Sequence, residues 1–105
     1  MLRAHRRQLL TSNFIIDETI TLIRARLGWQ AARIFDERAR GGKLARYVAV
    51  EPQDEDAAWD IFVRYHDHAF SFTDCTSFAI MRRLGLTTAV SLDEDFRTFG
   101  FHCLP

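Results

Sequence analysis

Short apolar runs alternate with longer helical patterns along this chain, and that alternation constrains the fold more than any single motif does. Short apolar or β-rich stretches predict strands at 9–11, 47–50, 88–92 and 101–104. Apolar residues at helical spacing, with capping and stop residues around them, predict helices at 13–27, 29–40, 52–66, 74–84 and 93–99. Strands separated by helices indicate an α/β fold of three layers, α/β/α, with a mainly parallel sheet covered on both faces.

Single residues set the limits and faces of these helices. Ser12 or Asn13 can cap the first helix, because either side chain accepts from a free backbone N–H, and Gly28 marks its end. Pro52 fits the first turn of the third helix. The expected apolar stripes are Ile16, Ile20, Ile23 and Leu27 on the first helix and Trp59, Phe62, Val63 and His66 on the third.

The length and composition bound the class of protein. Residues 1–105 are expected to form a single domain, long enough to bury a core. No apolar run approaches the roughly 20 residues of a membrane helix, and the basic start is followed by no clear signal segment. We therefore expect a cytoplasmic protein with no membrane partner. Cys75 and Cys103 form no motif and are expected as reduced thiols.

The formal net charge is zero, but the charges are unevenly distributed. Residues 1–46 hold ten Lys or Arg and four Asp or Glu, a balance of +6, and residues 47–105 hold the reverse, a balance of −6. A basic half beside an acidic half suits a polyanion held near a metal site. The alternative is two solvated surfaces that differ in sign.

Acidic residues stand where helices begin or strands end. Asp93 follows a predicted strand directly, Asp74 opens a helix, and Glu18 lies in the first turns of a helix that follows a strand. Because ligands of parallel α/β sheets bind outside the carboxyl ends of the strands, these three carboxylates can converge at one edge. A cation would then join them, and hard oxygen ligands select Mg²⁺ or Mn²⁺. Any one of these acids alone could instead stabilise a helix dipole.

Hydroxyl side chains accompany the acids in the sequence. They could hold a ligating water or a phosphate oxygen, and they are Thr11, Ser12, Thr73 and Ser77. The alternative for each is a helix cap, which we favour for Ser12 and Thr73.

A zinc site is a separate hypothesis. His66, His68 and Cys75 are close in sequence, but no clear fourth ligand accompanies them. A solvated loop between helices explains the two histidines equally simply.

Three blocks carry a family resemblance. Residues 10–18 (LTSNFIIDE), 71–84 (SFTDCTSFAIMRRL) and 89–101 (AVSLDEDFRTFGF) resemble the second, third and fourth conserved blocks of PIN-domain proteins of the VapC-like toxin type. The resemblance implies a magnesium-dependent endoribonuclease that hydrolyses phosphodiester bonds of RNA. It also implies that Glu18, Asp74 and Asp93 are catalytic metal ligands and Asp95 an accessory acid, whereas Asp17 matches no ligand position.

The first block of the family pattern has no match. PIN domains open with a strand that ends in an Asp, and no Asp or Glu precedes Asp17 here. The basic stretch from Arg3 to Arg7 resembles the tail of the helix that follows that strand. We therefore expect an N-terminally truncated PIN domain, arising from a start codon placed too late, from gene decay, or from a sheet whose neighbouring strands have closed up.

Two hypotheses about function follow. In the first, the chain is a toxin-type ribonuclease with an antitoxin partner, and Arg24, Arg26 and Arg33 contact the RNA backbone unless they are merely solvated helix residues. In the second, the missing acid leaves a non-catalytic module that binds RNA, an antitoxin-like protein or a second copy of itself as a homodimer. Exposed apolar surface would be the expected mark of the second hypothesis.

Overall fold

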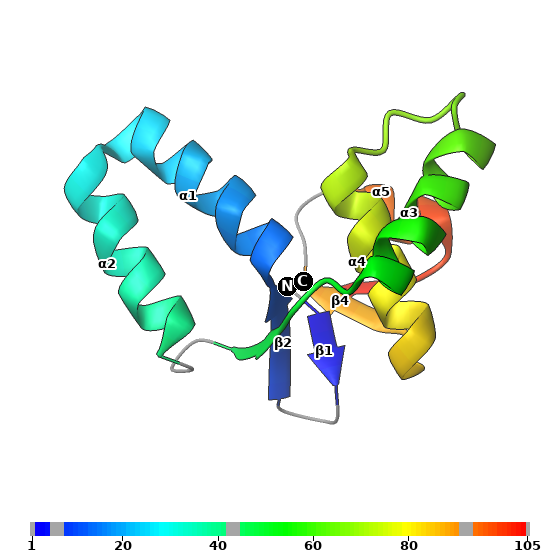
Figure 1. The fold of residues 1–105 in the computed structure, drawn as a ribbon, viewed down its shortest axis with the longest axis horizontal. Coiled ribbons are helices and arrows are strands. Elements are labelled where there is room, and N and C mark those ends of the chain that lie inside the picture. The colour runs from blue at the N-terminus through cyan, green and yellow to red at the C-terminus, as the bar shows by residue number, and fades with distance from the viewer. Residues whose placement is uncertain (1, 5–7, 42–44, 91–93, 105) are drawn as a thin grey trace.

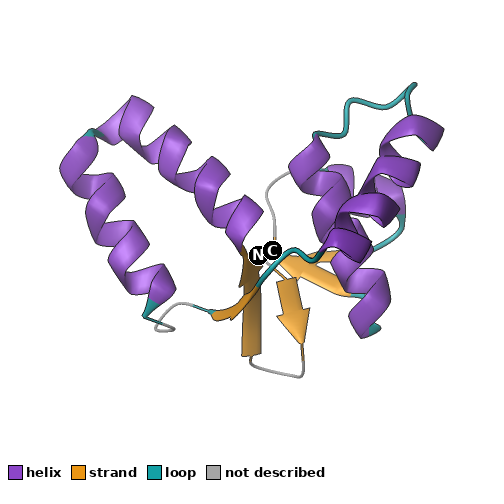
Figure 2. Ribbon diagram, viewed as in Figure 1, coloured by secondary structure: helices purple, strands orange, loops and turns teal. Residues whose placement is uncertain are grey.

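The computed structural model describes residues 2–4, 8–41, 45–90 and 94–104 (Figures 1 and 2). The strands are β1 (Leu2–Ala4), β2 (Gln8–Ser12), β3 (Arg46–Val48), β4 (Thr88–Val90) and β5 (His102–Leu104). The helices are α1 (Asn13–Leu27), α2 (Trp29–Arg40), α3 (Pro52–Arg64), α4 (Phe72–Leu84) and α5 (Asp95–Phe99). The order of elements after β1 is the order predicted from the sequence.

The strands form one sheet in the order β3-β2-β1-β4-β5. β2 pairs with β3 and β4 pairs with β5 in parallel, and the predicted α/β fold class is confirmed, with a sheet that is half parallel and half antiparallel in its pairings. The central β1 is antiparallel to both of its neighbours, with Leu2 opposite Leu10 of β2 and Ala89 of β4. The expectation that residues 3–7 are the tail of a helix is wrong for residues 3–4, which lie in β1. Residues 5–7 lie outside the described part of the chain. β1 supplies backbone partners to two strands that would otherwise lack them.

α1 and α2 form a helical hairpin that projects to one side of the sheet (Figure 1). Ser12 caps α1, since its Oγ accepts from the Ile15 N–H at 3.2 Å, and Gly28 makes the turn between the helices at φ +96°. The predicted stripe of α1 is confirmed only at its start. Ile16 is 1% exposed, whereas Leu27 is 74% exposed, because the hairpin extends beyond the body of the domain.

α3 and α4 pack against each other over the other side of the sheet (Figure 2). The predicted apolar face of α3 is wrong. Ala58 and Ile61 are the buried apolar residues of that helix, while Trp59 is 57% exposed and Phe62 and Val63 are exposed as well. His66 lies beyond the end of α3 and is also exposed.

The core lies between one face of the sheet and the helices α3, α4 and α5. Its buried members are Leu10, Ala58, Ile61, Phe70, Cys75, Phe78, Ala79, Ile80, Met81, Ala89 and Phe96. Phe78 is at its centre, stacked on Phe99 with ring centroids 4.3 Å apart. The opposite face of the sheet is less covered, since Tyr47 and Leu104 are 41% and 40% exposed.

Smaller differences concern the ends of elements. β3 begins one residue earlier than predicted and ends at Val48. The helix predicted to begin at Asp93 begins at Asp95, and residues 91–92 of the predicted strand lie outside the described residues. Among the described helices, none is long and apolar enough to cross a membrane.

Candidate active site

Asp74 is the third residue of α4 and helps to cap it. Its backbone N–H donates to Ser71 Oγ at 3.0 Å, and its Oδ2 accepts from the Ser71 N–H at 3.2 Å. This capping box fixes the carboxylate at the start of the helix. The other carboxylate oxygen has no hydrogen-bond partner within the described ranges. Asp74 is therefore a helix-start acid, as its alternative interpretation has it, and its role as a metal ligand stays a prediction.

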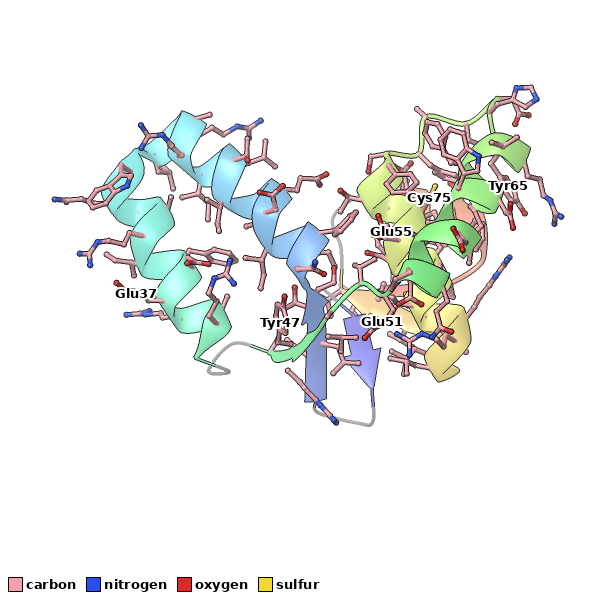
Figure 3. The ribbon with its side chains drawn as sticks, viewed as in Figure 1. Glu37, Tyr47, Glu51, Glu55, Tyr65 and Cys75 are labelled. Carbon is pink, nitrogen blue, oxygen red and sulfur yellow. The ribbon has the colours of Figure 1, made fainter. Side chains whose placement is uncertain are left out.

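Asp95 is the first residue of α5, and the charges of Asp74 and Asp95 both act on the buried thiol of Cys75. The Cys75 side chain is fully buried on α4 (Figure 3). Burial, and to a smaller extent the negative charges of Asp74 and Asp95, raise the pKa of its thiol to about 11. The two acids act on this thiol from different helices, Asp74 from α4 and Asp95 from α5. The position of Asp74 at a helix start suggested it as a ligand, and the family resemblance added Asp95 as an accessory acid; both roles stay predictions.

Glu18 is exposed in the second turn of α1, whose first turn lies beside that of α4. The rings of Phe14 on α1 and Phe72 on α4 are 6.4 Å apart, which joins the two helix starts. Asp93 lies outside the described residues. Within the described residues, no three His, Cys, Asp or Glu side chains are grouped to hold a metal. The full set of Glu18, Asp74, Asp93 and Asp95 therefore stays a prediction.

The hydroxyl residues divide into caps and unpaired groups. Ser12 is a cap, as predicted, but Thr73 is not, because Ser71 caps α4. The Oγ1 of Thr11 and the Oγ of Ser77 are buried without a hydrogen-bond partner in the described part of the chain. Such a group costs about 1–3 kcal/mol when left unpaired. Ser77 lies one turn after Asp74, where a water or an oxygen ligand would satisfy it.

These donors fit a hard cation better than zinc. Carboxylate and hydroxyl oxygens are the ligands that Mg²⁺ and Mn²⁺ prefer. Zinc would take the Cys75 thiolate, which the raised pKa disfavours, and His66 and His68 are exposed in the turn after α3. His68 Nδ1 contacts Asp67 at 3.0 Å, and the described residues bring no zinc group together.

An aromatic patch, missed by the sequence analysis, covers the outer side of these helix starts. It consists of Phe14, Trp59, Phe62 and Phe72, with neighbouring ring centroids 5.7–6.5 Å apart. Glu55 and Asp56 precede Trp59 by one helical turn and are exposed, so the patch has an acidic border (Figure 3). The signal for it was the helical spacing of Trp59 and Phe62, which was interpreted as a core face.

A hollow lies at the other end of α4 from Asp74. It has a volume of about 560 Å³ and is lined by Leu10, Arg46, Tyr47, Val48, Leu84, Gly85 and Leu86. Ten residues of helix separate Leu84 from Asp74, about 15 Å at 1.5 Å per residue. The hollow is therefore not part of the candidate site.

The candidate RNA-contacting arginines lie away from the acids. Arg24 and Arg26 are in the last turn of α1, and Arg33 is in α2, where its guanidinium lies 5.5 Å from the centre of the Trp29 ring. All three arginines are exposed. Arg33 also pairs with Glu37 on the same helix at 3.0 Å (Figure 3).

The comparisons with known proteins agree with this fold. The PIN domain family matches residues 2–102. This chain belongs to the PIN-domain family. It is 38% identical over 92 residues to the 23S rRNA-specific endonuclease VapC20 of two strains of Mycobacterium tuberculosis, and the match covers 88% of this chain and 70% of the relative.

A solved structure gives the same result. The crystal structure of Mycobacterium tuberculosis VapC20, described as a Sarcin-Ricin loop cleaving toxin, superposes with a TM-score of 0.85 at 36% identity. The superposition covers 91% of this chain and 73% of the VapC20 chain. The predicted PIN fold and the resemblance to VapC-like toxins are therefore confirmed.

Proposed function

We propose that this chain is a metal-dependent endoribonuclease of the VapC toxin type, which hydrolyses phosphodiester bonds in the sarcin–ricin loop of 23S rRNA. The observation that carries the proposal is the 38% identity to VapC20 over 88% of the chain. Two further observations support it. The charges of Asp74 and Asp95, at the starts of α4 and α5, both act on the buried Cys75 thiol, and Ser77 has an unsatisfied hydroxyl one turn from Asp74.

The metal would be Mg²⁺ or Mn²⁺, held by Glu18, Asp74 and Asp93 with support from Asp95. When bound, such an ion lowers the pKa of a water and stabilises the charge of an in-line displacement. The chain's own part is to orient the carboxylates. The Ser71 N–H holds the Asp74 carboxylate at the helix start, and the protonated Cys75 thiol adds no charge to the site.

RNA is the proposed substrate, and an antitoxin protein and a second copy of the chain are the proposed partners. The cytoplasm, where ribosomal RNA is found, is the proposed location. The aromatic patch beside Asp74, with its acidic border, offers an exposed surface to a protein partner.

The alternative is a non-catalytic module that binds RNA or protein. One observation favours it: the Asp74 carboxylate already serves as a helix cap. The alternative predicts RNA binding without cleavage and no response to a divalent cation.

Metal binding and cleavage can be tested with matched variants. Thermal unfolding of the chain is followed with and without Mn²⁺ in the wild type, in Asp74→Asn and in Asp17→Asn. Asp17 is exposed beside Glu18 but matches no ligand position, so Asp17→Asn removes an equal charge nearby. An Asn at position 74 keeps an oxygen that can accept from the Ser71 N–H, so the loss of a cap does not confuse the result.

At ten times its dissociation constant, Mn²⁺ should stabilise the folded wild type by about 1.4 kcal/mol. That corresponds to roughly 5–10 °C in melting temperature for a domain of this size. Asp17→Asn should respond like the wild type and Asp74→Asn much less. Cleavage of a sarcin–ricin loop hairpin should follow the same order. RNA binding without cleavage, together with no Mn²⁺ response, would establish the alternative instead.

A further inference from the structure

The turn between α1 and α2 carries exposed apolar side chains surrounded by arginines. We call this group the basic tip; it consists of Leu27 and Trp29 with Arg24, Arg26 and Arg33. Leu27 is 74% and Trp29 59% exposed, the largest exposures among the described large apolar residues. Exposure of this kind on a projecting hairpin is unfavourable for the isolated domain and indicates a binding surface.

The charge of the basic tip selects the kind of partner. No Asp or Glu occurs from residue 19 to residue 35, and Arg24 and Arg26 have no ion-pair partner in the described part of the chain. Arg33 lies against the Trp29 ring, which holds a positive charge beside an exposed aromatic face. This combination of aromatic ring and guanidinium is how proteins contact single-stranded RNA, since bases stack on the ring and phosphates pair with the arginines.

A continuous surface joins the basic tip to the candidate active site. Glu18, Leu22 and Arg26 follow one another at steps of four along α1, and all three are exposed. The nine residues from Glu18 to Leu27 span about 14 Å of helix, so an RNA strand of a few nucleotides can reach both ends. Figure 1 shows the tip at the end of the hairpin farthest from the sheet.

We propose that the basic tip is a second RNA-binding site, in which Trp29 stacks on an unpaired base and the arginines contact the flanking phosphates. The proposal rests on the proposed function for the identity of the RNA, and it adds a residue that positions the substrate away from the cut. A second copy of the chain is a poorer occupant, because a symmetric contact through this tip would place arginines against arginines. The aromatic patch is also a poorer RNA site, because Glu55 and Asp56 beside Trp59 repel phosphates.

The chain has two tryptophans, Trp29 and Trp59, so each can be observed separately. The ligand is a sarcin–ricin loop hairpin transcript, and the protein carries Asp74→Asn so that binding is measured without cleavage. In a Trp59→Phe background, only Trp29 emits, and RNA should quench its fluorescence. Trp29→Ala should weaken binding roughly tenfold, and Trp29→Phe should restore most of the affinity, because stacking requires an aromatic ring.

Arg26→Gln and Arg38→Gln form a matched pair for the phosphate contacts. Both arginines are exposed, but Arg38 lies in the last turn of α2, far from the tip. Arg26→Gln should lower the slope of log K against log salt by about 0.7, the value for one phosphate contact on a single strand, and Arg38→Gln should leave it unchanged. Cleavage of a dinucleotide by a chain with Asp74 intact should be the same with and without Trp29→Ala, since a dinucleotide is too short to span the distance of about 14 Å from Glu18 to the tip.

The outcomes separate this proposal from the proposed function. Cleavage of the hairpin with no quenching of Trp29, or equal salt slopes for the two arginine variants, would overturn the RNA-binding tip and leave the nuclease intact. Quenching and the expected slopes without cleavage would support the tip and refute the nuclease. If light scattering shows that Trp29→Ala converts a dimer to a monomer and RNA affinity stays constant, the tip is a contact between copies and the proposal is wrong.

Discussion

A buried ion pair between α3 and α4 makes the sharpest stability prediction. The Asp54 side chain is 2% exposed and accepts two hydrogen bonds from Arg83, at 2.7 and 2.9 Å. It also accepts from the Glu51 N–H at 3.0 Å, which completes the capping box of α3. One carboxylate therefore starts a helix and attaches it to its neighbour.

The expected magnitudes follow from this geometry. Arg83→Met leaves a buried carboxylate with a single backbone donor, and breaking a buried pair in this way costs 3–5 kcal/mol. Because the Arg83 side chain is 34% exposed, we expect the lower end, about 3 kcal/mol. Asp54→Asn keeps an oxygen for the Glu51 N–H but loses the charge, and should cost about 2 kcal/mol. The double variant should cost little more than Arg83→Met alone, which gives a coupling of about 2 kcal/mol.

Acid pH should remove the difference between Arg83→Met and the wild type. Burial alone would raise the pKa of Asp54, but the hydrogen bonds from Arg83 and Glu51 and the charge of Arg83 lower it below its ordinary value of 3.8. A carboxyl with a lowered folded pKa stabilises the protein above its unfolded pKa, and the effect is lost as the pH falls through the folded value. The gap between the two proteins should therefore be constant from pH 7 to about pH 4 and shrink below it.

Urea denaturation at several pH values measures the free energy of unfolding of the wild type, the two single variants and the double variant. Asp56→Asn is the control, since Asp56 is an exposed acid on the same helix. Asp56→Asn should change the free energy of unfolding by less than about 0.5 kcal/mol. The reasoning fails if the coupling is near zero, or if the cost of Arg83→Met stays the same at pH 3. A stability of about 5–15 kcal/mol makes losses of this size easy to measure.

Two further predictions concern single side chains. Because the pKa of Cys75 is raised to about 11, a thiol reagent at pH 8 should modify Cys103 first and Cys75 only on unfolding, and Cys103→Ser should abolish the fast phase. Equal rates of modification for both thiols would contradict this account. The raised pKa also means that the contribution of Cys75 to the free energy of unfolding is complete below pH 9.0 and is lost as the pH rises through about 11. Asn13 Oδ1 accepts from the Val50 N–H at 2.7 Å, so Asn13→Ala should cost about 1 kcal/mol in urea denaturation. Asn13→Asp keeps the acceptor and should cost less, and identical losses would show that the hydrogen bond contributes nothing.

The ends of helices could be predicted because local residues determine them. Ser12 starts α1 because its side chain accepts a hydrogen bond from a free backbone N–H, and Gly28 ends α1 because it adopts a positive φ. Gly85 likewise ends α4 with a φ of +70°. These signals act within one helical turn and need no tertiary contact. The start of α4 was predicted two residues late, at Asp74 instead of Phe72. The capping box explains the error, because it joins Ser71, which precedes the helix, to Asp74, which is already the third residue inside it.

The buried face of α3 could not be predicted for a physical reason. Asp54, Ala58 and Ile61 are buried and have helical spacing, but so do Trp59, Phe62 and Val63, which are larger and more apolar. Hydrophobicity favours the second set. Close approach of α3 to α4 requires the small Ala58, and Arg83 on α4 makes a buried Asp54 tolerable. The sequence of one helix contains neither fact, because both depend on the partner helix.

The direction of β1 determines which elements can build the acidic site. β2 and β4 run the same way, so their carboxyl ends reach one edge of the sheet, and the edge outside carboxyl ends is where ligands bind. β1 lies between them in the opposite direction, with Ala4 beside Gln8 at the start of β2. Its carboxyl end therefore reaches the opposite edge of the sheet. The central strand completes the hydrogen bonding of the sheet. The proposed metal site would therefore depend on the acids at helix starts, Glu18 on α1, Asp74 on α4 and Asp95 on α5, acting together.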